Sequence, residues 1–168
     1  MTGGQTTGQD LLEAALDSWD RNNAILVNLL RLIPDGGLQA RATEGSPSVA
    51  QMFSHVHYVR LVFVSEDAPE FARAMPKDEW SGEHNPSQLA AMLNDSAKAV
   101  REAVQNKIAT GGEMKLHYDH PLFFLQHMIW HEGYHHGQIK LALKLAGKPI
   151  LNEAAGPGTW RVWMNKTK

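Results

Sequence analysis

Four stretches of the chain repeat apolar residues at intervals of three, four and seven, as one face of an α-helix requires, and proline and glycine interrupt the chain between them. The pattern predicts helices over residues 9–33, 47–64, 86–108 and 121–145. Ser46, followed by proline, is the expected N-cap of the second helix. Short links precede the second and fourth helices, and a long connection over residues 66–84, with one short helix near 70–75, precedes the third. The expected fold class is all-α, a four-helix bundle with one long crossover connection.

The length of the chain favours one domain. A chain of 168 residues is long enough for one domain with a proper core and too short for two ordinary domains. We expect residues 9–150 to form the bundle and residues 151–168 to form a C-terminal arm packed on it. Trp160 and Trp163 favour docking of this arm, as a short strand or as an extended segment.

Composition excludes several classes of function. Sixteen Lys and Arg against eighteen Asp and Glu give a net charge of −2, which argues against nucleic acid as a partner. The absence of cysteine excludes disulfides, thiolate metal sites and a cysteine nucleophile. No apolar run approaches the roughly 18 residues of a membrane span, and the first residues do not resemble a signal peptide. We therefore expect a cytoplasmic protein with no membrane partner.

Histidines are concentrated in the fourth predicted helix. The chain has nine histidines, and six of them lie between His117 and His136. His131 and His135 are four residues apart, so their rings lie on one side of a helix, roughly 6 Å apart along its axis. Neutral imidazoles in such a pair bind ions such as zinc, nickel, copper or iron, and need one or two further ligands.

A third ligand is expected from the second helix, which carries His55 and His57. Each lies roughly 100° from the centre of the apolar face, so periodicity leaves both open. His127 shares the stripe of the histidine pair, and it either lines a cavity or supports a metal ligand, or it is a buried histidine bonded to a carbonyl. His136 is expected to be exposed. Arg60 lies near the apolar face, where a stem that snorkels to solvent is favoured over an anion-binding role.

Two segments resemble the DinB/YfiT-like superfamily. Residues 130–139, WHEGYHHGQI, are similar to its signature helix, in which a histidine pair precedes Gly-Gln. Residues 46–56, SPSVAQMFSHV, are similar to its second helix, which ends in the first metal histidine. The resemblance covers about residues 9–147 and implies a four-helix bundle, often homodimeric, with a divalent metal held by His55, His131 and His135. His136 departs from the family pattern, which commonly has arginine there.

The resemblance also implies a range of functions. Characterised relatives include S-transferases that use the thiols bacillithiol or mycothiol, and a maleylpyruvate isomerase. We expect a zinc- or nickel-dependent enzyme that activates a water or a low-molecular-weight thiol cosubstrate, as a transferase or hydrolase of a small-molecule substrate. Glu132 is the candidate catalytic residue, as a general base or a support for the ligands, although simple exposure is equally compatible with its position.

Two other functions stay open. His131, Glu132 and His135 also form the His-Glu-x-x-His motif of zinc peptidases, with Glu153 downstream as a further ligand. The segment Gly156-Pro157-Gly158 follows too soon for the second helix that would present Glu153, so this alternative is disfavoured. The other alternative is a bundle that binds a metal or a partner without catalysis.

Overall fold

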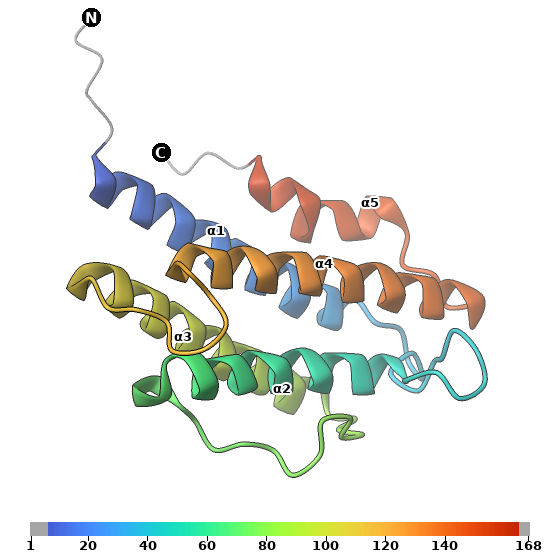
Figure 1. Ribbon diagram of the computed structural model, residues 1–168. Coiled ribbons are helices and arrows are strands. Elements are labelled where there is room, and N and C mark those ends of the chain that lie inside the picture. Colours follow the sequence, from blue (N-terminus) through green and yellow to red (C-terminus); the bar gives the residue numbers. More distant parts are fainter. Residues whose placement is uncertain (1–6, 165–168) are drawn as a thin grey trace, which may run out of the picture.

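The computed structural model describes residues 7–164 and shows four long helices lying side by side (Figure 1). The four are α1 (Gly8–Arg31), α2 (Val49–Asp67), α3 (Pro86–Thr110) and α4 (Pro121–Leu145). The predicted all-α four-helix bundle is confirmed, and each predicted helix end lies within three residues of the observed one. The short helix expected near residues 70–75 is a single turn, η1 (Pro69–Phe71). None of the described helices combines the length and apolar character needed to cross a membrane.

The start of α2 differs from the prediction. Its N-cap is Ser48, because Ser48 and Gln51 form a capping box in which each side chain bonds the backbone N–H of the other residue. The Ser46 hydroxyl instead bonds the backbone of Thr43 in the preceding turn. The Asn85 side chain caps α3, and Gly111, in the left-handed region at φ 66°, ends that helix.

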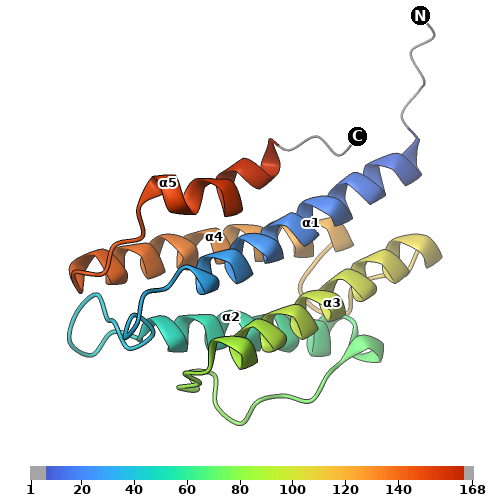
Figure 2. The same ribbon diagram turned by 180° about the vertical axis from the view of Figure 1, so that it is seen from behind.

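The long connection follows from the directions of the helices. Figures 1 and 2 show α2 and α3 running the same way, with α1 and α4 running opposite to them. Residues 68–85 therefore return along the length of the bundle from the end of α2 to the start of α3. α1 packs on α3 and α4, and α2 packs on the same two helices.

The core has two apolar sections with buried polar side chains between them. One section includes Phe53 and the other includes Phe124, and both of these rings are fully buried. Between the sections lies one residue from each long helix, a set that we call the polar layer: Asn22, Arg60, Ser96 and Glu132.

Arg60 connects the members of the polar layer. Its Nε and Nη2 donate to the two carboxylate oxygens of Glu132 at 2.6 and 2.7 Å. Its Nη1 donates to the Leu93 carbonyl at 2.7 Å, and its guanidinium carbon lies 4.8 Å from the centre of the Trp19 ring. The prediction that Arg60 snorkels to solvent is wrong, because this ion pair lets the side chain be wholly buried.

The C-terminal segment is helical, so the expectation of a strand or extended arm is wrong. It consists of α5 (Asn152–Ala155), η2 (Gly156–Gly158) and η3 (Trp160–Trp163), and residues 165–168 lie outside the described part of the chain. The segment contacts α1, where Asn28 Nδ2 donates to the Gly158 carbonyl at 2.9 Å and Arg21 donates to the Val162 carbonyl. Trp160 and Trp163 line a cavity of about 280 Å³ between this segment, α1 and α4.

Candidate metal centre

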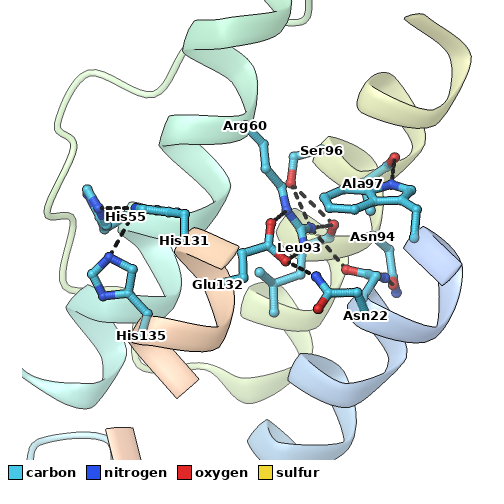
Figure 3. Close-up of polar contacts among 12 residues, drawn as sticks. Asn22, His55, Arg60, Leu93, Asn94, Ser96, Ala97, His131, Glu132 and His135 are labelled. Carbon is cyan, nitrogen blue, oxygen red and sulfur yellow. Dashed lines mark hydrogen bonds and ion pairs between the residues drawn. The ribbon is translucent and has the colours of Figure 1, made fainter. Parts of the chain in front are cut away.

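Three histidine side chains from two helices meet at one point. His55 comes from α2, and His131 and His135 come from successive turns of α4, which packs on α2 (Figure 3). The Nε2 atom of His131 lies 3.3 Å from Nε2 of His55 and 3.1 Å from Nε2 of His135. The three ligand atoms lie within 4.8 Å of one another, so one ion can contact all of them.

The separations fit a divalent ion. With zinc–nitrogen bonds of 2.0–2.1 Å, two ligands of a tetrahedral ion are about 3.3 Å apart, close to the two observed separations. Imidazole nitrogens are ligands that zinc, nickel, copper and iron accept. Three histidines also leave at least one coordination position free, which is typical of catalytic sites.

The histidines are neutral at pH 7, as metal ligands must be. Burial, together with the neighbouring His135 and His55, lowers the pKa of His131 to about 3. Burial, with the nearby His55, lowers the pKa of His135 to about 4. Burial likewise lowers the pKa of His55, although Glu79 opposes the shift.

Two residues that sequence reasoning did not single out contact His55. Glu79 Oε1 lies 2.8 Å from His55 Nδ1, and the Trp80 ring stacks on the imidazole with centres 4.2 Å apart and planes 2° apart. Both residues belong to the connection over residues 68–85, where the chain has no regular periodicity. No sequence pattern therefore marked them.

His55, and not His57, belongs to the three-histidine group, a choice that the periodicity of the sequence left open. His57 is buried beside α3, where burial lowers its pKa and a hydrogen bond to the backbone of Met92 opposes the shift. It does not belong to the three-histidine group.

The remaining histidines of α4 lie outside the group. His127 Nδ1 lies 2.8 Å from the Tyr118 hydroxyl, so its partner is a side chain and not the carbonyl considered above. His136 is half-buried, so the expectation that it is exposed is wrong. It lines the cavity of about 280 Å³ together with Trp160 and Trp163.

Glu132 follows His131 in the chain but faces another part of the bundle. Its side chain is 1% exposed, which excludes the exposed alternative. Both carboxylate oxygens accept bonds from Arg60, and Oε2 accepts a further bond from Asn22 (Figure 3). A general base must reach a proton of the substrate or water, and this carboxylate is directed into the polar layer.

A mainly apolar cavity of about 370 Å³ adjoins two of the three histidines. Its wall includes residues of α2 and α4, of the link before α2, and of the connection before α3. The lining residues are Ala42, Ser46, Pro47, Met52, His55, Trp80, Tyr134, His135, Gln138 and Leu141.

These features define an all-α bundle protein with a candidate three-histidine metal centre beside a mainly apolar cavity. The family model of the DinB family matches residues 5–154, and the chain belongs to that family. The resemblance inferred from the sequence is thus confirmed. Comparisons with curated proteins and with solved structures found no match.

Proposed function

We propose that this protein is a divalent-metal-dependent enzyme, a thiol S-transferase or a hydrolase, that acts on small molecules. The observation that carries the proposal is the meeting of three neutral imidazoles at the edge of an apolar cavity. His55, His131 and His135 would hold the ion, with zinc or nickel the expected metals. A divalent ion bound in this way lowers the pKa of a water or thiol, which supplies a nucleophile near neutral pH.

The cavity supports a neutral substrate with an apolar body. None of the described residues that line it is Lys, Arg, Asp or Glu, so apart from the bound ion it offers no ionic partner to a carboxylate or phosphate group. Met52, Trp80 and Leu141 supply apolar wall, and Gln138 and the histidines supply polar atoms. A volume of about 370 Å³ lies within the range of small-molecule sites.

Metal content of purified protein tests the ligand set. We expect the parent protein and a His57→Ala variant to retain about one ion per chain after desalting, and His55→Ala and His131→Ala to lose it. His57 is the matched control because it is buried on the same helix, outside the group. Retention of the ion by both His55→Ala and His131→Ala would exclude this site. Loss of the ion in His57→Ala and His131→Ala, but not in His55→Ala, would move the third ligand to His57.

A two-part screen tests the reaction class. Metal-loaded protein would be incubated with bacillithiol or mycothiol and an uncharged aromatic electrophile, and separately with an uncharged aryl ester and with casein. We expect thiol transfer or ester hydrolysis that depends on the metal and is lost in His131→Ala. Metal-dependent cleavage of casein that is lost in Glu132→Gln would favour the peptidase instead. Inactivity in every assay would favour the alternative of a non-catalytic metal-binding bundle.

The geometry favours an enzyme that acts on small molecules over a zinc peptidase. The third histidine of the group is His55, whereas Glu153, the ligand that the peptidase alternative needs, is exposed on α5. Glu132, the general base of that alternative, is bound by Arg60. We therefore infer that Glu132 supports α4 through the polar layer.

We also infer that two copies of the chain associate through α4. Its outer face carries a stripe of large apolar side chains that are 51–71% exposed: Phe123, Trp130, Tyr134, Leu141 and Leu145. At roughly 100–150 Å² of exposed surface each, they offer on the order of 600 Å² per copy, most of the ~800 Å² of a stable interface. Nothing lies within 4 Å of a side-chain position at Gly133 or Gly137, so a second helix can approach closely there.

A further inference from the structure

Glu79 approaches the ring nitrogen of His55 that is not directed toward the other two histidines, and Trp80 stacks on a face of the same ring. Glu79 Oε1 lies 2.8 Å from Nδ1, whereas Nε2 faces His131. The Trp80 ring is almost parallel to the imidazole at 4.2 Å. Neither residue has a role in the function proposed above beyond the contribution of Trp80 to the cavity wall.

The backbone of this dipeptide is fixed where its side chains can reach His55. Gln51 Nε2 donates to the Trp80 carbonyl at 3.1 Å, and Trp80 N–H donates to Asp78 Oδ1 at 3.0 Å. Gln51 lies one helical turn before His55 on α2, so the anchor and the contacted ring are on the same face of the helix. The irregular segment around Trp80 is therefore connected to α2 at two residues, Gln51 and His55.

We propose that Glu79 and Trp80, which we call the His55 clamp, are positioning residues for the metal centre. With an ion bound, the Glu79 carboxylate, 2.8 Å from Nδ1 of His55, would accept a hydrogen bond from Nδ1–H, and this tautomer leaves the lone pair of Nε2 directed toward His131 and His135. Trp80 restricts rotation of the ring by stacking on it. A carboxylate on the outer nitrogen of a ligating histidine fixes its tautomer and raises its basicity as a ligand.

The clamp acts on one ligand of the three. A carboxylate oxygen of Glu79 lies 2.8 Å from His55 Nδ1, whereas His131 Nδ1 has no partner among the residues that the structure describes. His131 and His135 lie one turn apart on the same helix, so α4 itself fixes their backbone positions relative to each other. His55 comes from a second helix, so its ring benefits most from an outside restraint.

The test uses Glu79→Gln, which has the same shape and lacks the charge. The control is Glu83→Gln in the same connection, because the Glu83 side chain bonds the backbone of Asn85 and has no contact with His55. Zinc affinity is measured by competition with a chromophoric chelator. We expect Glu79→Gln to bind zinc about 10- to 100-fold more weakly, and Glu83→Gln to match the parent protein. A second variant, Trp80→Leu, should weaken binding between about two- and tenfold.

Nitrogen-15 spectra of the zinc-loaded imidazoles give a readout that a merely structural role would not move. We expect His55 to be protonated on Nδ1 in the parent protein. In Glu79→Gln the Nδ1–H signal of His55 should shift and exchange faster with water, while the signals of His131 and His135 stay in place.

This inference rests on the proposed metal centre, and the outcomes separate the two. If the parent protein binds no zinc, the proposed centre fails and the clamp fails with it. If the parent protein binds zinc but Glu79→Gln and Trp80→Leu bind it equally well, with the Nδ1–H signal of His55 unmoved, the clamp alone is wrong.

Discussion

His131 and Glu132 are neighbours in the chain, but their side chains serve different parts of the bundle (Figure 3). Successive residues of a helix point about 100° apart, so His131 meets His55 while Glu132 enters the polar layer. The ion pair of Glu132 with Arg60 is wholly buried. Each charge is therefore stable in the interior only while the other is present.

Glu132→Gln should destabilise the protein, because it leaves the Arg60 guanidinium buried without a counter-charge. We expect the free energy of unfolding, measured by urea denaturation, to fall by about 3–5 kcal/mol. Glu153→Gln, on the exposed surface of α5, is the control and should change stability little. A stable Glu132→Gln protein that binds metal but has lost its reaction would show that Glu132 is the general base after all.

At the scale of elements, Gln51 connects the start of α2 with the connection before α3. Its Oε1 accepts from Ser48 N–H in the capping box, and its Nε2 donates to the Trp80 carbonyl. The same side chain thus begins a helix and holds a segment that is 29 residues away in the chain.

Gln51→Glu separates these two roles. A carboxylate still completes the capping box, but it cannot donate to the Trp80 carbonyl. We expect the helical circular dichroism to be unchanged, and amide hydrogen exchange at residues 78–82 to be faster than in the parent protein. Gln51→Ala, which loses both bonds, should show the same exchange and should also lose about 1 kcal/mol of stability. Unchanged exchange in both variants would show that other contacts hold the connection.

Elements with a regular repeat were predictable, and segments placed by distant contacts were not. The period of the apolar residues located α1 to α4, because burial of one face imposes that period. Periodicity left His55 and His57 open, since both lie off the apolar face, and the choice depends on how α2 is rotated against α4. Glu79 and Trp80 have no local signal, because a hydrogen bond from α2 places them. The helical turns after residue 151 were missed because the stretch is short and rich in glycine and proline.

At the scale of the whole molecule, we expect the bundle to fold without the metal. Two apolar core sections, with side chains from all four long helices, bury enough surface for a domain of this size. We expect chelation to leave the helical circular dichroism intact well below the melting temperature. The melting temperature should fall, because an ion that binds only the native state stabilises it by mass action. Loss of the helical signal on chelation would show that the metal is structural.

The association of two copies through α4 can be tested by changing the stripe. Trp130→Glu places a charge at its most exposed residue, which does not line the cavity of about 370 Å³. We expect the parent protein to sediment as a dimer at micromolar concentration and Trp130→Glu to sediment as a monomer. Leu11→Glu, at an exposed apolar position on α1, should remain dimeric. A monomeric parent protein would exclude this interface.

The three histidines lie on regular helices, whereas Ala42, Pro47 and Trp80 of the cavity wall lie in irregular segments. Irregular surface segments accept substitutions and insertions more readily than packed helices do. Descendants of one ancestral gene can therefore diverge in the compounds they accept by changing residues 32–48 and 68–85, while selection preserves the ligands. Two paralogues with the same three histidines could therefore differ in substrate, and the sequences of these two segments would be the first place to look for that difference.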